Sequence, residues 1–143
     1  MNKFKEIRPI VLGIAIKDNK LLVGESYDNE KNQTFYRCLG AGIEFLEEST
    51  DALKREFKEE LNADIVVKDF LGVFENIFTY TGKNAHEIVF FYSIEIPDKY
   101  YKDEYKIIDQ TNHVAKWIDI SEFKNGEKIL YPTGTLKYIK NIC

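Results

Sequence analysis

The sequence predicts an α+β domain in which helices cover the faces of a mixed β-sheet. Strand-like runs outnumber helix-like ones along the chain, and only two helices stand out. The 143 residues contain no internal repeat, low-complexity tract or Pro/Gly/Ser-rich linker, so we expect residues 1–143 to form a single domain. An apolar fraction of 44%, with 10 Phe and 9 Tyr, suits a packed core and is too high for a disordered chain.

The expected strands are short runs rich in β-branched, aliphatic and aromatic residues. These runs are residues 10–16, 21–23, 34–38, 65–75, 87–96 and 114–120. The segments between them are rich in Asp, Asn and Gly, which favour turns and loops. The expected turns and loops are Asp18-Asn19, residues 26–33, residues 40–44 and residues 81–84.

Residues 51–61 form the most helix-like segment of the chain. Ser49 or Thr50 is expected to cap its N-terminus, because either hydroxyl can accept a hydrogen bond from a free backbone N–H group. Apolar side chains recur at every fourth position of this segment, which predicts a buried stripe along one side. A second helix is expected at residues 132–139 near the end of the chain.

The acidic residues concentrate around the first of these helices. Residues 44–60 hold seven acids and three bases, so this window alone accounts for the net charge of −4. Three of the acids, Glu56, Glu59 and Glu60, fall on adjoining arcs of one helix face. Like charges at this spacing destabilise a helix by about 0.2–0.5 kcal/mol per pair unless a cation offsets them.

Two interpretations of this acidic face are open. It could be a solvated surface, on which neighbouring lysines and an arginine offset the acids. It could instead bind Mg²⁺ or Mn²⁺, which prefer carboxylate, carbonyl and water oxygens as ligands. The glycine-containing loop just upstream favours the second interpretation, because it can bring backbone groups to the same place.

A longer pattern spans the loop and the helix. It reads Gly40-Ala-Gly-Ile-Glu-Phe-Leu-Glu47, then seven residues, then Arg55-Glu-Phe-Lys-Glu-Glu-Leu-Asn-Ala63. This pattern resembles the signature of the Nudix hydrolase superfamily, G-x5-E-x7-R-E-U-x-E-E-x-G-U, in which U is a bulky apolar residue. The resemblance implies a Nudix-type α/β/α sandwich with a mixed β-sheet.

Every charged position of the signature is present, but three glycines are replaced. Ala41 stands at the first signature glycine, and we expect it to serve there if its φ angle is negative. Leu46 replaces a glycine that is common just before the first signature Glu. Asn62 replaces the last signature glycine, where Asn is expected to form the left-handed cap of the helix.

The resemblance also implies a divalent-metal site. By position, the metal ligands fall on Glu56, Glu59 and Glu60, joined by a backbone carbonyl of Gly40 or Ala41. The implied cofactor is Mg²⁺ or Mn²⁺.

The implied catalytic residues are Glu56, Glu59 and Arg55. Arg55 matches the arginine that orients the catalytic glutamates, and Glu47 and Glu44 match supporting carboxylates. Glu59 is the first choice for the general base that takes a proton from water. The alternatives for the base are Asp103, Glu104 and Asp109.

The implied reaction is hydrolysis of a diphosphate linkage in a nucleoside diphosphate joined to another group, so the expected partner is a small nucleotide-type molecule. Arg37, Glu44 and Tyr80 are the residues expected to contact substrate. Arg37 could hold a phosphate with its guanidinium, although a structural ion pair is an equal alternative. Tyr80 stands at a spacing that resembles Nudix members acting on diadenosine polyphosphates, where a tyrosine stacks on a base, and ordinary packing is the alternative.

Composition limits the remaining functions. The absence of a basic excess argues against binding long nucleic acids. The sequence contains no run of eighteen apolar residues, so it predicts no membrane-spanning helix. Two cysteines cannot build a disulfide framework, so we expect a cytoplasmic protein. A nucleotide sensor without catalysis and an enzyme acting on RNA 5′ ends are the alternative functions, and a homodimer is an alternative to a monomer.

Overall fold

The computed structural model describes residues 5–108 and 113–142. Its strands are β1 (Ile7–Lys17), β2 (Lys20–Asp28), β3 (Gln33–Cys38), β4 (Gly40–Gly42), β5 (Val66–Tyr80), β6 (Lys83–Glu95), β7 (Glu104–Lys106), β8 (Val114–Asp119) and β9 (Leu130–Tyr131). Its helices are α1 (Ser49–Leu61), α2 (Ile120–Lys124), α3 (Thr135–Ile142) and the short 3-10 helix η2 (Asp98–Tyr100).

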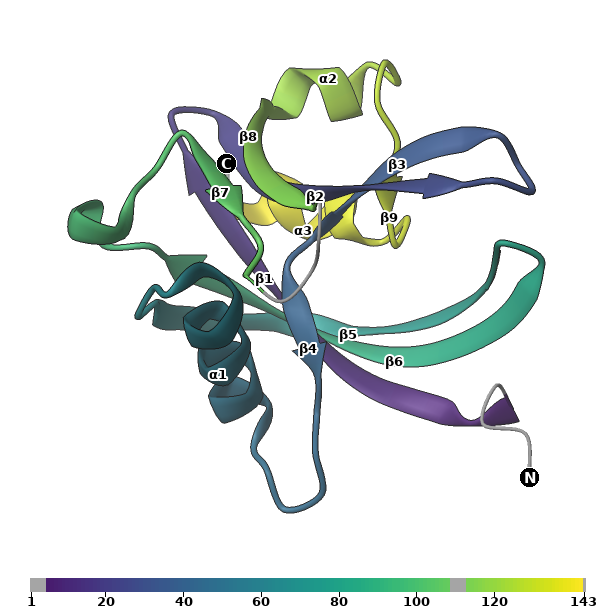
Figure 1. The fold of residues 1–143 in the computed structure, drawn as a ribbon, viewed down its shortest axis with the longest axis horizontal. Helices are drawn as coiled ribbons and strands as arrows, with labels where there is room; N and C mark the ends of the chain where they lie inside the picture. Colours follow the sequence, from purple (N-terminus) through teal and green to yellow (C-terminus); the bar gives the residue numbers. More distant parts are fainter. Residues whose placement is uncertain (1–4, 109–112, 143) are drawn as a thin grey trace.

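The strands form one mixed sheet, which confirms the predicted α+β class. Strand β1 runs parallel to β6 and antiparallel to both β2 and β4, so it joins the two halves of the sheet. Helix α1 lies on one side of the sheet, and α2 and α3 lie on the other (Figure 1). Within the described ranges, no helix combines the length and apolar content that a bilayer crossing requires.

The apolar stripe of α1 packs as the sequence predicts. Leu53, Phe57 and Leu61 are buried in one core cluster together with side chains of β1, β4 and β6. Full burial of one such side chain contributes about 1.5–3 kcal/mol. The packing fixes the rotation of α1, so that an adjoining arc of the helix carries Glu56, Glu59 and Glu60, of which Glu60 is buried.

The predicted loop over residues 26–33 is wrong in its first part, because β2 continues through Asp28. The carboxylate of Asp28 is buried and accepts backbone N–H groups of Glu30 at 3.0 Å and Lys31 at 3.1 Å. It also accepts the N–H of Thr81 at 3.2 Å, from the other hairpin. A polar residue therefore ends this strand inside the fold, which its composition alone did not indicate.

The predicted strands at residues 65–75 and 87–96 are shorter than the strands found in the structure. Strands β5 and β6 pair along nearly their whole lengths and meet at a turn of Thr81 and Gly82, both with positive φ. Polar residues interrupt the apolar pattern of these strands, so composition does not predict their full length. Short elements such as α2, β4, β7 and β9 were also missed, because two to five residues carry too little periodicity.

The predicted N-cap of α1 is corrected, because Ser49 and Thr50 both lie inside the helix and Glu48 precedes it. The hydroxyl of Ser49 instead shares a hydrogen bond of 2.7 Å with the hydroxyl of Tyr92 on β6. At the other end, Asn62 has φ 54° and ψ 40°, the left-handed conformation expected for the cap.

Candidate active site

The loop before α1 is held tightly against β1. Gly40 faces the Val11 carbonyl so closely that an added Cβ would collide with it, which explains the glycine at this position. Ala41 pairs with Val11 in the β-ladder and is not among the residues with positive φ. The condition under which Ala can replace the signature glycine is therefore met.

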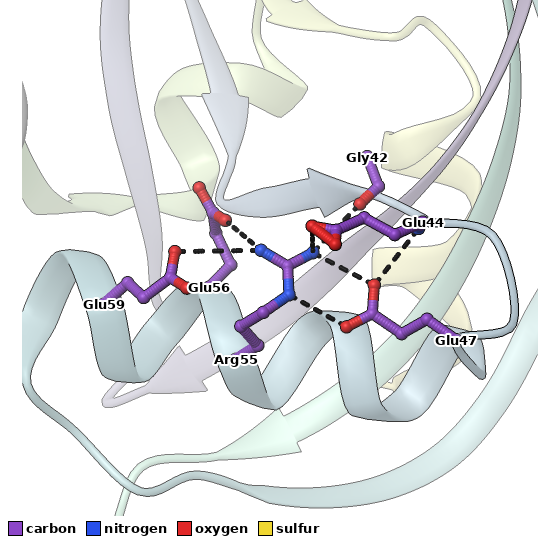
Figure 2. A network of polar contacts seen from close by, with 6 residues as sticks. All are labelled: Gly42, Glu44, Glu47, Arg55, Glu56 and Glu59. Atoms are coloured by element: carbon purple, nitrogen blue, oxygen red, sulfur yellow. Dashed lines mark hydrogen bonds and ion pairs between the residues drawn. The ribbon is translucent and has the colours of Figure 1, made fainter.

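Arg55 is the centre of a polar network that joins this loop to α1 (Figure 2). Its Nε donates to Oε2 of Glu47 at 2.8 Å, and its Nη2 donates to Oε1 of the same carboxylate at 3.1 Å. Nη2 also donates to the Gly42 carbonyl at 3.2 Å and lies 3.8 Å from a carboxylate oxygen of Glu44. These bonds, together with the Glu44 N–H, hold the pKa of Glu47 below its ordinary value.

The same guanidinium reaches the carboxylates of α1. Nη1 of Arg55 lies 3.3 Å from Oε2 of Glu56 and 3.7 Å from Oε2 of Glu59. A guanidinium that bonds several carboxylates fixes their positions and offsets their mutual repulsion. Arg55 therefore sets where two of the candidate glutamates lie.

A cavity of about 300 Å³ opens beside this network, between β1, β2, β3, β4 and α1. Glu60 lines it and is only 8% exposed. Gly40 and Ala41 line the same cavity, as do Arg8 and Arg37. Glu56 and Glu59 do not line it and lie against Arg55 instead.

The donor types at this cavity fit a hard divalent cation. The Glu60 carboxylate and the residues of β4 provide oxygen atoms from two elements of the fold, which suits Mg²⁺ or Mn²⁺. Within residues 5–108 and 113–142, no three His, Cys, Asp or Glu side chains are gathered closely enough to form a complete ligand set. Glu56 and Glu59 would have to turn from Arg55 to join Glu60.

Comparison with solved structures identifies the fold. No family model and no curated protein sequence matches the chain. A NUDIX hydrolase from Nitrosomonas europaea is similar over 96% of this chain and 88% of its own, with a TM-score of 0.70 and 16% identity. A MutT NUDIX hydrolase from Burkholderia pseudomallei is similar over 97% and 100%, with a TM-score of 0.63 and 16% identity. The chain has the Nudix fold. This confirms the predicted α/β/α sandwich.

A third structure with the Nudix fold comes from methicillin-resistant Staphylococcus aureus 252 and is titled DNA mismatch repair protein MutT. It is similar over 96% of both chains, with a TM-score of 0.58 and 21% identity. At these identities the likeness shows the fold alone.

The structure places Arg37 in an ion pair on the wall of the cavity. Its Nη2 donates to Oε1 of Glu87 at 2.7 Å, and the same oxygen accepts a hydrogen bond from Asn76 at 3.4 Å. Arg37 is 24% exposed and Glu87 is 8% exposed. Sequence reasoning missed Glu87, although a single acid inside the apolar run of β6 is a signal for a buried functional or paired charge.

Tyr80 lies at the end of β5 and does not line the cavity. Its ring packs edge-on against Phe35 with the centroids 5.8 Å apart, and its hydroxyl donates to the Tyr27 carbonyl at 3.4 Å. The structure therefore gives Tyr80 a packing role between the two hairpins and does not bring it to the acidic helix.

Three of the four candidates for the general base lie within the described residues. Glu59 is half exposed beside Arg55, and Asp103 accepts a hydrogen bond from the Tyr101 hydroxyl at 3.2 Å. Glu104 begins β7, opposite Lys116 of β8. The fourth candidate, Asp109, lies outside the described residues.

Leu46 has the strained conformation of the loop. Its φ is 68°, in the left-handed region that favours glycine, and its side chain is 90% exposed. The neighbouring Phe45 is also almost fully exposed. The position at which glycine is common in the signature therefore keeps a glycine-like backbone although it carries leucine.

Proposed function

We propose that this protein is a divalent-metal-dependent hydrolase of a diphosphate linkage in a nucleoside diphosphate joined to another group. The observation that supports the proposal is the shared cavity, which is lined by Glu60, the residues of β4 and two arginines. The Arg55 network beside the cavity holds two further carboxylates within reach. A cavity lined by both carboxylates and guanidinium groups suits a metal-bound polyphosphate.

Glu56, Glu59 and Glu60, with a backbone carbonyl of Gly40 or Ala41, would hold Mg²⁺ or Mn²⁺. When bound, the ion supplies Lewis-acid chemistry that withdraws negative charge from phosphate oxygens.

The chain itself supplies orientation and a proton acceptor. Arg55 holds Glu56 and Glu59 beside the cavity through its Nη1 group, and both carboxylates would turn from it to join Glu60 when the ion binds. Glu59, which is half exposed, takes the proton of the attacking water as the water oxygen bonds to phosphorus. The bridging P–O bond breaks, and two phosphorylated products leave the site.

The experiment that tests this function measures product release from a panel of nucleoside diphosphate derivatives, nucleoside triphosphates and dinucleoside polyphosphates. We expect turnover of at least one compound with Mg²⁺ or Mn²⁺ and none with excess EDTA. Glu60→Gln is expected to lower kcat by at least about a hundredfold, because it removes a charged oxygen donor.

A matched control is Asp51→Asn, which removes one carboxylate from the exposed first turn of the same helix. It should keep wild-type activity. Equal activity of Glu60→Gln and wild type would refute the ligand assignment. Binding of panel compounds without any turnover would instead support the nucleotide sensor.

A further inference from the structure

The arginines of this chain are distributed unevenly. Among 20 Lys and Arg residues only three are arginine, and all three lie at the candidate site. Arg8 and Arg37 line the cavity, and Arg55 lies beside it on α1. No lysine is among the residues that line the cavity. A guanidinium binds carboxylate and phosphate groups through two parallel hydrogen bonds, which an ammonium cannot do.

Two of the three arginines are already occupied. Arg55 bonds the carboxylates of the loop and of α1, and its hydrogen bond to Glu47 raises its own pKa further. Arg37 bonds Glu87 at 2.7 Å in a mostly buried pair. Redirecting either guanidinium to a substrate would leave a carboxylate without its cation.

Arg8 differs from both. It is exposed, it lines the cavity, and among the described residues its side chain makes no hydrogen bond or ion pair. It lies next to the loop, because a Cβ added to Gly42 would sit 3.4 Å from Nη2 of Arg8. The carbonyl of the same glycine accepts a hydrogen bond from Arg55, so Arg8 lies alongside the carboxylate network.

The charges that line the cavity make this free cation important. Three carboxylates line it, those of Glu25, Glu60 and Glu87, together with two guanidinium groups; Glu25 is paired with Lys116 at 3.1 Å. One of these guanidinium groups, that of Arg37, is already neutralised. A phosphate inside a partly enclosed site needs a compensating charge, and among the described residues Arg8 is the guanidinium of the lining that is not already paired with a carboxylate.

We propose that Arg8 is the residue that binds the diphosphate of the substrate, and that Arg37 serves as a fixed part of the cavity wall. This inference rests on the proposed function for the identity of the substrate. Arg8 then binds ground state and transition state alike, through the phosphate oxygens and without taking part in proton transfer.

The test measures binding of methylenediphosphonate, a diphosphate analogue whose bridging carbon cannot be hydrolysed, by calorimetry in the presence of Mg²⁺. Arg8→Gln is expected to weaken binding about ten- to a hundredfold, the loss of a charge-assisted bidentate contact. The affinity of Arg8→Lys should lie between those of wild type and Arg8→Gln, because lysine keeps the positive charge but cannot form two parallel hydrogen bonds. The double variant Arg37→Gln/Glu87→Gln removes both partners of the ion pair in the cavity wall. Its affinity for the analogue should lie within about threefold of that of wild type.

The control for a general charge effect is Lys124→Gln, which removes a positive charge at the end of α2. It should bind as wild type does. In turnover assays, Arg8→Gln should raise KM and leave kcat nearly unchanged, the pattern of lost uniform binding.

The proposal is overturned if Arg8→Gln binds the analogue as tightly as wild type, if Lys124→Gln loses as much affinity, or if wild type does not bind it. If Arg8→Gln loses binding while wild type turns over nothing in the substrate panel, the anion site stands and the hydrolase function fails.

Discussion

Replacing Arg37 by Gln tests whether this arginine belongs to the wall of the cavity or to the substrate. The substitution removes the cation that lies 2.7 Å from the Glu87 carboxylate. Glu87 is 8% exposed and keeps only a weak hydrogen bond from Asn76 at 3.4 Å. We therefore expect Arg37→Gln to lower the free energy of unfolding substantially.

The size of the loss follows from the geometry. At 2.7 Å and an effective dielectric constant of about 20, the attraction between Arg37 and Glu87 is about 6 kcal/mol before the cost of desolvation is subtracted. Removing one partner of a fully buried pair costs about 3–5 kcal/mol. Because Arg37 is 24% exposed and water can reach it, a loss of about 2–3 kcal/mol is expected.

Urea unfolding at pH 7 of wild type, Arg37→Gln, Glu87→Gln and the double variant completes a mutant cycle. The double variant should be more stable than Arg37→Gln alone, because no buried charge remains unpaired. Additive effects of the two single substitutions would refute the reasoning, since they would mean that the two side chains do not interact in solution.

Three further predictions concern the loop that precedes α1. Leu46→Gly should raise the free energy of unfolding by about 0.5 kcal/mol, because relief of about 1–2 kcal/mol of left-handed strain exceeds the entropy cost of glycine. The midpoints of urea unfolding measure this gain, and Leu46→Ala should not show it. Glu47→Gln should destabilise the protein at neutral pH. Since Arg55 lowers the folded pKa of Glu47, that stabilisation is present above the ordinary pKa of 4.5 and is lost as pH falls through the folded value, so urea midpoints of the two proteins should converge in acid. Ala41→Gly should retain activity within about twofold, and a large loss in the hydrolysis assay would show that Ala41 shapes the β4 backbone in a way that its extended pairing does not reveal.

The parts of the fold that the sequence predicts are those governed by local patterns. The i, i+4 spacing of Leu53, Phe57 and Leu61 identified the buried side of α1, and the same spacing placed the carboxylates on an arc next to it. Asn62 at the helix end predicted a left-handed cap because few residues tolerate that conformation. In each case the residues that determine the feature lie within four positions of it in the sequence.

The parts that the sequence does not predict depend on partners far along the chain. Ser49 is a good N-cap in isolation, but Tyr92, 43 residues away, takes its hydroxyl. Asp28 looks like a loop residue until Thr81 of the second hairpin donates to it. Such competition between a local preference and a distant hydrogen bond is decided by packing, which only the folded chain reveals.

The same distinction explains the different roles of the three arginines. Arg55 has acids at positions one and four residues further on, so its ion pairs can be read from the sequence of α1. The partner of Arg37 is 50 residues away on β6, and nothing near Arg37 in the sequence indicates that its charge is neutralised. Arg8 becomes significant only after those two pairs are assigned, because its value as an anion site comes from having no carboxylate partner among the described residues at a cavity where the other cations have one.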